Sequence, residues 1–383
     1  MCPVVDMLYF NYSTFWPADW WSRRSFLRAW WFIYASDPRW VPPDYAALKS
    51  LTLRTASPLW QGLQAQPLYM EALPRRERTG HSAIGQPLLA GAVFEEAVAA
   101  CVLHFAPEHD GGTAYFGLLR CANDEETLER LLGAALEAAS ERGCTRLVGP
   151  VGVIPAWESG ALTNQFHVIP PLHTPYNPPY LPDLLASVMA PVLETTLYEL
   201  PALTGEEAAP AGPAKLEPLP LSHVDASLAP LVAAALAPHA AVDDVAAHEV
   251  EVLRKWIGAW PAAGWLARVD GEAVGFVLAQ PDTAALMRRA RGGRRLPLRL
   301  YRLWARRRPP THGRLLLGAV APKWRRHGIG AQLLHQVLRH AQVEGWTGLA
   351  CGPYAPDSAA ARLMERFGAQ PVQRYHLYEW NAW

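Results

Sequence analysis

The feature that most constrains this chain is a strand, a glycine-containing turn and a helix that follow one another at residues 315–338. An apolar run at 315–320 has strand character and is stopped by Pro322. A short basic stretch then leads through Gly328 and Gly330 into apolar residues at helical spacing: Ile329, Leu333, Leu334, Val337, Leu338 and Ala341. Because glycine lets backbone N–H groups approach a ligand and a helix N-terminus carries partial positive charge, the pattern predicts an anion site suited to a pyrophosphate.

Two common phosphate-binding motifs do not fit this turn. A Walker loop needs Gly-Lys-Ser/Thr after four variable residues, and a dinucleotide fingerprint needs Gly-x-Gly-x-x-Gly. The turn instead reads Val320-x-Pro322-x-x-Arg325-x-x-Gly328-Ile329-Gly330-Ala331, which resembles the acyl-CoA loop of the GNAT acyltransferase superfamily. The resemblance implies that acetyl-CoA or another acyl-CoA is bound as co-substrate by Ala319, Val320, Arg325, Arg326, His327, Gly328, Ile329, Gly330 and Ala331.

Three short sequence echoes, in the same order, indicate that the chain contains an internal repeat. Glu96-Ala97-Val98 matches Glu272-Ala273-Val274, Gly143-Cys144-Thr145 matches Gly345-Trp346-Thr347, and Leu197-Tyr198-Glu199 matches Leu377-Tyr378-Glu379. A Pro/Ala/Gly-rich run at 201–213 separates the halves and is typical of a linker. We therefore expect an α/β (α+β) fold of two tandem GNAT-like domains, at 1–200 and 214–383, each with a mixed, mainly antiparallel twisted sheet flanked by helices.

The first domain is predicted to lack the cofactor loop. Its expected strands lie at 88–94, 98–105, 115–120 and 146–150, with a helix at 124–142. After the strand at 115–120 the chain has no glycine and three acids, Asp124, Glu125 and Glu126. Negative charge at this position would repel a pyrophosphate, so only the second domain is expected to bind acyl-CoA.

An aromatic-rich segment at 16–43 is interpreted as core or domain-interface packing, since aromatic side chains at such density more often pack than bind a ligand. It ends in Asp37-Pro38-Arg39-Trp40-Val41-Pro42-Pro43. This motif, together with Asn177-Pro178-Pro179-Tyr180, resembles a bacterial family of large two-domain GNAT proteins, most of them without an assigned substrate.

The resemblance also implies a chemistry. Acyl-CoA would lie between two splayed strands, here 314–320 and 348–353, while an amine attacks the thioester and backbone N–H groups near Ala319 and Val320 polarise the acyl carbonyl. The family often protonates the leaving thiolate with a tyrosine in the pattern Asn-x-x-Ala-x-x-Leu-Tyr. Here Asp357 stands for the Asn and Met364 for the Tyr, so we predict Tyr354 as the acid and place Asp357 in the same catalytic site. The general base stays open among Asp243, Asp244, Glu249, Glu251, His312 and water.

An arginine-rich insertion at 282–311 has no counterpart in the first domain. Ten arginines and no acids occupy 288–308, interleaved with leucine and aromatic residues. A solvated face is one interpretation; contact with CoA phosphates, with an anionic acceptor or with anionic lipid is the other. Nucleic acid is not an expected partner, because the formal net charge of the chain is zero.

The five cysteines are an odd count without CxxC spacing, which favours reduced residues in a cytoplasmic protein and suggests no metal site. The predicted function is transfer of an acyl group, with acetyl the expected one, from CoA to an amine of a small molecule. Two alternatives stay open: long-chain acyl transfer to a lipid amine, and a non-catalytic acyl-CoA-binding regulator. Aminoacyl transfer from tRNA is disfavoured because tandem GNAT domains of that kind dispense with the loop. Acceptor and oligomeric state are not predicted.

Overall fold

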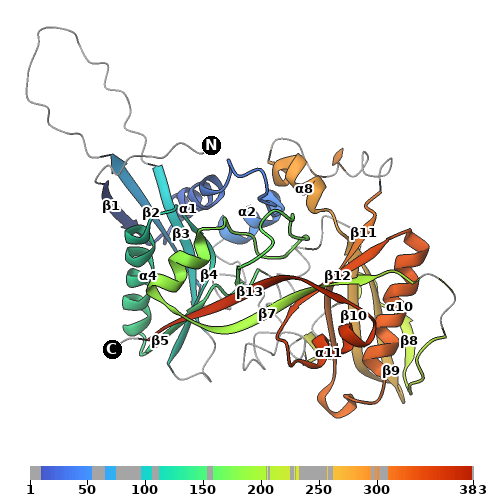
Figure 1. The fold of residues 1–383 in the computed structure, drawn as a ribbon. Helices are drawn as coiled ribbons and strands as arrows, with labels where there is room; N and C mark the ends of the chain where they lie inside the picture. Colours follow the sequence, from blue (N-terminus) through green and yellow to red (C-terminus); the bar gives the residue numbers. More distant parts are fainter. Residues whose placement is uncertain are drawn as a thin grey trace, which may run out of the picture.

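One continuous sheet organises the computed structural model of the protein (Figure 1). Its thirteen strands include twelve in the order β1-β2-β3-β4-β5-β13-β7-β12-β11-β10-β9-β8, with β6 pairing β13 beside this path. The structure describes residues 10–53, 65–74, 96–105, 112–152, 158–203, 205, 208–224, 228, 230–232, 257, 262–294, 298, 300–301 and 309–381. The expected strand at 88–94 lies outside these residues.

The N-terminal half forms the left part of Figure 1. Its strands are β1 (Phe10–Phe15), β2 (Gln66–Pro74), β3 (Glu96–Phe105), β4 (Thr113–Cys121), β5 (Arg146–Gly149) and β6 (Ala161–Leu162). The helices are α1 (Trp20–Ile33), α2 (Tyr45–Leu53), α4 (Glu125–Ser140) and α5 (Leu181–Val188). The predicted strands at 98–105, 115–120 and 146–150 and the helix at 124–142 are therefore present, with ends shifted by a few residues.

The C-terminal half repeats this arrangement on the right of Figure 1. Its strands are β8 (Lys215–Pro218), β9 (Ala263–Val269), β10 (Glu272–Pro281), β11 (His312–Val320) and β12 (Gly348–Tyr354). The helices are α8 (Ala284–Ala290), α10 (Ile329–Glu344) and α11 (Ala359–Arg366), with short 3-10 turns η1 (Leu221–His223), η3 (Arg291–Gly293) and η4 (Pro322–Trp324).

The last strand of each half joins the sheet of the other half. β7 (Ala190–Pro201) pairs antiparallel with β12, and β13 (Gln370–Asn381) pairs antiparallel with β5. The two strands also pair with each other across the middle of the molecule (Figure 1). In the repeated Leu-Tyr-Glu segments, Tyr198 donates to Glu365 of α11 and Tyr378 donates to the Pro182 carbonyl at the start of α5. Each half is thus completed by a strand from the other.

The other two sequence echoes also occupy matching places. Helices α4 and α10 both end in a glycine with positive φ, Gly143 at 80° and Gly345 at 73°. In each case the glycine and the next residue donate backbone hydrogen bonds back to the last helical turn, which is the Schellman arrangement. The repeat seen in the sequence is therefore a repeat of local structure.

Three apolar clusters stabilise the sheet. One lies under α4 and a second under α10 and α11. The third joins α1 and the following loop to strands of the C-terminal half, and contains Trp30, Trp31, Trp40, Phe276 and Leu317. This third cluster confirms the packing role predicted for the aromatic segment, although its first part is exposed, with Trp21 72% accessible. No helix in the described part is long and apolar enough to cross a membrane.

Candidate active site

A groove of about 1100 Å³ opens between β11 and β12 and is bordered by α10 and α11. The two strands pair in parallel only at their beginnings, where residues 312–314 face residues 348–350. Beyond Arg314 and Ala350 the register ends and the groove begins. A splayed pair of neighbouring strands exposes backbone groups that would otherwise be used in the sheet, so a ligand can lie between them.

The loop at 321–328 closes the outer end of this groove. Pro322 begins the turn η4, Arg326 takes a φ of 67°, and Gly328 takes a φ of 84° as the residue before α10. The first turn of α10 carries no acidic residue and no side chain caps it. Since the first N–H groups of a helix have no acceptor within the helix, they face the groove as donors for an anion.

Seven of the nine residues predicted to bind the cofactor line the groove: Ala319, Val320, Arg325, Arg326, Gly328, Gly330 and Ala331. The other two lie differently. Ile329 is 1% accessible and belongs to the core under α10, and the exposed His327 ring contacts the Arg325 carbonyl at 2.9 Å. Binding of the cofactor by these nine residues stays a prediction, and the seven that line the groove support it most directly.

The described residues of the predicted linker contact the first turn of α10 and the end of the loop at 321–328. The Gln332 side chain of α10 donates to the Gly212 carbonyl at 3.2 Å and accepts from the Ala214 N–H at 3.3 Å. A Cβ on Gly328 would lie 2.7 Å from the Ala211 carbonyl oxygen. Glycine at 328 is therefore required both by its positive φ and by this close approach.

Strand β11 carries a bulge inside the groove. Leu278 of β10 pairs with Leu317, but the next residue, Ala279, pairs with Leu315, so Leu316 is extra. A bulge re-aims the backbone groups around it, and such places are common beside active sites. The bulge lies upstream of Ala319 and Val320, the positions that the sequence predicted for polarising the acyl carbonyl.

Arg314 sits where the two strands separate and is fully buried. Its guanidinium donates to the carbonyls of Ala350 (3.2 Å) and Gly352 on β12, and to the Leu172 carbonyl of the N-terminal half (3.1 Å). Burial lowers the pKa of this group. Sequence reasoning missed Arg314, although a single arginine in an otherwise apolar strand is the signal that could have identified it.

Tyr354, the predicted acid, lies at the end of β12 and lines the groove. Burial raises the pKa of its phenol, with a further contribution from Cys351, while Arg314 acts in the opposite direction. The hydroxyl therefore stays protonated at neutral pH. A phenol of raised pKa can stabilise a thiolate by donating a hydrogen bond, and full proton transfer from it is less favourable.

Asp357 precedes α11, is exposed, and does not line the groove. Its backbone carbonyl accepts from Arg362 at 2.6 Å, and Ser358 caps the helix by accepting from the Ala361 N–H at 3.0 Å. Met364, in the place of the usual tyrosine, is buried. The catalytic role of Asp357 stays a prediction that its position supports less well than that of Tyr354.

The buried face of α11 differs from the one expected. In the sequence, Ala360, Leu363 and Phe367 stand at helical spacing and predict the buried face, whereas Ala361 and Met364 are the buried residues of the helix. The reason is that a second apolar face, with Ala360 and Leu363, is turned towards the groove. The predicted C-cap is present, because Gly368 takes a φ of 80° and donates to the Glu365 carbonyl.

The general base is not identified by the structure. Asp243, Asp244, Glu249 and Glu251 lie outside the described residues. His312 is exposed and its ring lies 3.8 Å from the Glu199 carboxylate on β7. Burial raises the pKa of Glu199 and that of Asp282, so both carboxyls hold a proton more readily than an exposed acid. Neither lines the groove.

The described part of the arginine-rich insertion packs on the N-terminal half. Helix α8 and turn η3 lie against the loop after α1, and Arg288 donates to the Pro38 carbonyl. None of the groove-lining residues comes from the described part of 282–311. Among the described residues there is also no cluster of His, Cys, Asp or Glu suited to a metal ion.

The start of α4 in the N-terminal half differs from that of α10. Only residues 122–124 connect β4 to the helix. The Asp124 carboxylate accepts from the Thr127 N–H at 2.8 Å, and Glu125 and Glu126 follow in the first turn. The donors that face the groove at α10 are satisfied at α4 by a side chain of the protein itself.

Comparison with known proteins shows which proteins share this fold. The model of the acetyltransferase (GNAT) family matches residues 234–369. A tandem GNAT protein from the clavulanic acid biosynthesis pathway is 15% identical, with a TM-score of 0.56 over 97% of this chain and 99% of that chain. A probable N-acyltransferase from Enterococcus faecalis is 8% identical, with a TM-score of 0.55 over 98% and 73%. A GCN5-related N-acetyltransferase from Anabaena variabilis is 10% identical, with a TM-score of 0.54 over 97% and 72%.

Identities this low show a shared fold, and no curated protein sequence matches the chain. The family match is more specific, because it includes β11, the loop at 321–328, α10, β12 and α11, which together form the groove. Residues 234–369 therefore match a GNAT acetyltransferase domain, and the chain has the fold of tandem GNAT proteins, which supports an acyltransferase that uses acyl-CoA.

Proposed function

We propose that the protein transfers an acetyl group from acetyl-CoA to an amine of a small molecule, with one CoA site per chain. The observation that carries this proposal is the groove between β11 and β12, which begins at the uncapped start of α10 and ends at buried Arg314. The pyrophosphate would contact the donors of the loop, and the thioester would lie near the bulge at Leu316.

A short acyl group fits the inner end of the groove. Arg314 joins β11 to β12 there through the carbonyls of Ala350 and Gly352. Leu316 and Leu317, which line the groove, are each less than 5% accessible and pack into the core shared with α1. A long acyl chain would have to displace a guanidinium bonded to three carbonyls, and burying those carbonyls unpaired would cost about 1–3 kcal/mol each.

The two domains would divide the work. The domain at 214–383 would bind acyl-CoA, with Tyr354 donating a hydrogen bond to the leaving thiolate. The domain at 1–200 would lack a cofactor and shape the acceptor side, a role supported by the contact of its Leu172 carbonyl with Arg314 at 3.1 Å. Proximity of amine and thioester would then supply much of the rate.

The proposal is tested by a panel of CoA thioesters of increasing chain length, with binding measured by calorimetry and thiol release measured on mixtures of amines. We expect acetyl-CoA to bind and to release CoA thiol only when an amine is present. Preference for long-chain thioesters with lipid amines would replace the acetyl donor with the long-chain alternative. Binding without turnover on any amine would instead support an acyl-CoA-binding regulator.

A further inference from the structure

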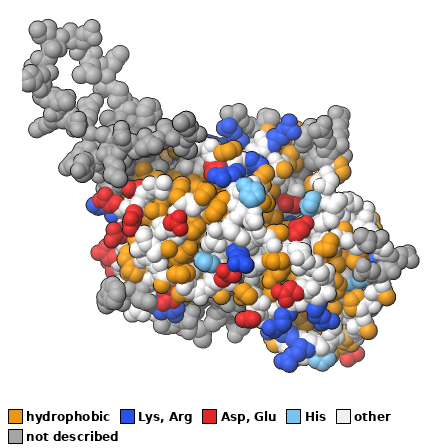
Figure 2. Space-filling view, viewed as in Figure 1, with side chains coloured by type: hydrophobic (Ala, Val, Ile, Leu, Met, Phe, Trp, Pro, Cys, Tyr) orange, Lys and Arg blue, Asp and Glu red, His pale blue; other side chains and the backbone are white. Residues whose placement is uncertain are grey.

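A second cavity, of about 720 Å³, lies between the two halves and shares no lining residue with the acyl-CoA groove. One wall is the end of α1 and the following loop, with Trp31, Trp40 and Pro42. The other wall is α8 and η3 of the arginine-rich insertion, with Arg288, Arg289, Arg291 and Arg294. Figure 2 shows Lys and Arg side chains gathered in the region of α8.

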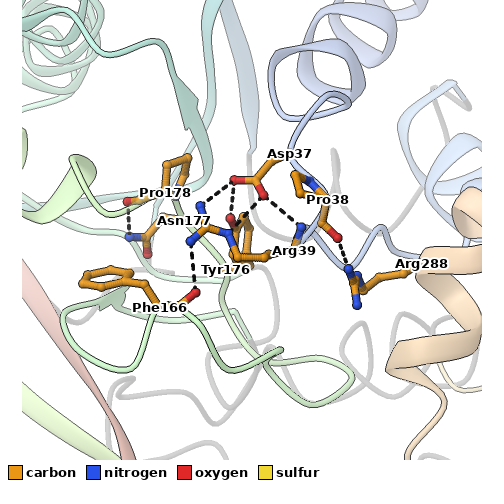
Figure 3. Close-up of polar contacts among 8 residues, drawn as sticks. All are labelled: Asp37, Pro38, Arg39, Phe166, Tyr176, Asn177, Pro178 and Arg288. Carbon is orange, nitrogen blue, oxygen red and sulfur yellow. Dashed lines mark hydrogen bonds and ion pairs between the residues drawn. The ribbon is translucent and has the colours of Figure 1, made fainter. Parts of the chain in front are cut away.

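The charges of this cavity are strongly unbalanced. Four arginines and one carboxylate, Asp37, line it. Asp37 is already engaged, because Arg39 pairs with it at 3.3 Å and the Tyr176 hydroxyl donates to it (Figure 3). Among the described residues, Arg288, Arg291 and Arg294 form no ion pair with any carboxylate. These three positive charges are therefore not neutralised by a described carboxylate, although Arg294 also lies 5.9 Å from the centre of the Tyr45 ring.

The walls are held in place by contacts between the halves, which distinguishes this cavity from a solvated basic face. Arg288 donates to the Pro38 carbonyl (Figure 3). Gly292, with a φ of 62°, packs so closely that a Cβ would lie 2.3 Å from the Pro43 carbonyl oxygen and 2.6 Å from Trp31. Trp31 and Trp40 are 3% and 6% accessible. The arginines therefore project from a fixed backbone over an aromatic floor.

We propose that this cavity binds a small molecule that carries a phosphate group on an apolar or aromatic body. Arginine is suited to phosphate because its planar guanidinium donates two parallel hydrogen bonds to it. Ala35, Pro38 and Ala285, which are exposed, supply apolar contact area beside the buried tryptophans, and the volume is that of ordinary small-molecule sites. The same phosphate chemistry could come from a free metabolite or from a lipid headgroup; the position of the arginines between two walls favours the free molecule.

Binding here would also affect the two halves jointly. The ligand would contact residues from 31–42 and from 285–294, so it would stabilise the docking of the insertion on the N-terminal half. This role is independent of the acyl transfer proposed for the groove. A chain that fails to transfer acetyl groups could still bind phosphate esters at this cavity.

The test is calorimetric titration of the full chain, without CoA, with phenyl phosphate, inorganic phosphate and phenol. Phenyl phosphate should bind most tightly, and its affinity should fall as salt is added. Arg291→Gln or Arg294→Gln should weaken phenyl phosphate binding by about 10-fold, as expected for loss of a charge-assisted contact. The matched control is Arg142→Gln, an exposed arginine of the N-terminal half away from the cavity, which should leave binding unchanged.

A second variant helps to distinguish loss of a ligand contact from a folding defect. Ala285→Glu adds a carboxylate at an exposed position that lines the cavity, and it should also weaken phenyl phosphate binding by about 10-fold or more. The same titration on Gly330→Glu, in which the groove is blocked, should give an unchanged affinity for phenyl phosphate, because Gly330 does not line the cavity. Absence of binding, equal loss in Arg142→Gln, or binding only of phosphatidylglycerol vesicles and not of phenyl phosphate would each overturn the proposal.

Discussion

The two helices that follow the central strands of each half, α4 and α10, begin in opposite ways. Before α10 the chain makes an eight-residue loop at 321–328 and leaves the helix N-terminus open to the groove. Before α4 it takes three residues, 122–124, and caps the helix with the Asp124 carboxylate. One helix offers its donors to a ligand, and the other has an internal anion in the ligand's place.

The frameworks around these loops are nevertheless the same. The Ala122 N–H donates to the Val98 carbonyl at 2.8 Å, and the Ala321 N–H donates to the Val274 carbonyl at the same distance. Both helices end in the same Schellman arrangement, and both halves pair their central strands in parallel over three residues. The two halves share this framework and differ in the loop, so the predicted difference in cofactor binding is assigned to the loop and not to the fold.

In the described part of the N-terminal half, side chains of α1 and β4 pack where β4 ends. The Trp30 indole of α1 donates to the Leu118 carbonyl on β4, and the Arg120 guanidinium stacks over the rings of Trp30 at 4.4 Å and Tyr34 at 5.0 Å. All four side chains are less than 10% accessible. Where the C-terminal half keeps a groove, the N-terminal half has filled the position with its own aromatic and cationic side chains.

The largest effect is expected from Gly330→Glu, which should make the start of α10 resemble that of α4. A Cβ at 330 would make ordinary contacts, 3.5 Å from Leu363 and 3.9 Å from Val320, so the backbone can accept a side chain there. The added carboxylate would project where the pyrophosphate is proposed to bind. Calorimetry should show acyl-CoA affinity reduced by at least about 10³-fold, or about 4 kcal/mol.

Gly328→Glu would be a poorer test of the same idea, because its Cβ would clash with the Ala211 carbonyl and its φ disfavours a side chain. In the unaltered chain, the titration should give one acyl-CoA site. A stoichiometry of two sites per chain, or unchanged affinity in Gly330→Glu, would break the contrast between α4 and α10.

The next effect is expected from Tyr354→Phe. The residue after the Gly-Pro pair is Tyr354 in the C-terminal half and Val151 in the N-terminal half, so only one half carries a hydroxyl there. Removing it should lower turnover by about 10²-fold, the usual scale for a lost general acid or hydrogen-bond donor, with acyl-CoA affinity little changed. The turnover rate should be measured under conditions in which the chemical step is rate-limiting. An unchanged rate under these conditions would mean that Tyr354 is a packing residue.

How much of this contrast could be predicted from the sequence depended on how local each signal was. The loop at 321–328 was identifiable because Pro322 and Gly328 determine the backbone conformation of the few residues around them. The acids at Asp124, Glu125 and Glu126 were informative for the same reason. Among the described residues, the helix at 124–142 and the strands at 98–105, 115–120 and 146–150 followed from apolar periodicity, with their ends displaced by a few residues.

Features that depend on distant pairing were not predictable in this way. Nothing local in Leu197-Tyr198-Glu199 indicates that β7 pairs with β12 rather than with a strand of its own half. The inward direction of Arg314 and the docking of α8 on the loop after α1 likewise depend on contacts over more than a hundred residues. The buried face of α11 was misassigned because a groove-lining apolar residue and a core apolar residue have the same signature in sequence.

A smaller effect concerns acid stability, which should distinguish the halves. Burial lowers the pKa of His104 on β3 to about 4, whereas an imidazole in the unfolded chain has a pKa of about 6.5. Gln280 holds the corresponding position of β10 and does not titrate. Below pH 6.5 the imidazole binds a proton in the unfolded chain but not in the folded one. The contribution of His104 to the free energy of unfolding is therefore fully present above pH 6.5 and is lost as the pH falls towards 4.

At pH 5 this single group should reduce the free energy of unfolding by about 2 kcal/mol relative to pH 7. His104→Gln keeps a donor for the Val151 carbonyl, which the ring contacts at 3.1 Å, and should remove that share of the acid sensitivity. Denaturant unfolding of parent and variant at pH 7 and pH 5 measures this difference in acid sensitivity. Buried His173, with a pKa lowered to about 3, acts in the same direction in both proteins, so the difference isolates His104. Equal pH dependence of variant and parent would refute the assignment.

The smallest effect is expected from Asp124→Ala, which opens the N-terminus of α4 without supplying the rest of a cofactor site. The carboxylate satisfies the Thr127 N–H at 2.8 Å, so its loss should reduce the free energy of unfolding by about 1 kcal/mol. Acyl-CoA binding should stay at one site per chain, because Glu125 and Glu126 still carry negative charge and Trp30 still occupies the Leu118 carbonyl. Asn123→Ala, at the exposed residue next to Asp124, is the control for local disturbance. Denaturant unfolding and calorimetry together check the result, and the appearance of a second acyl-CoA site in Asp124→Ala would mean that the cap alone separates the two halves.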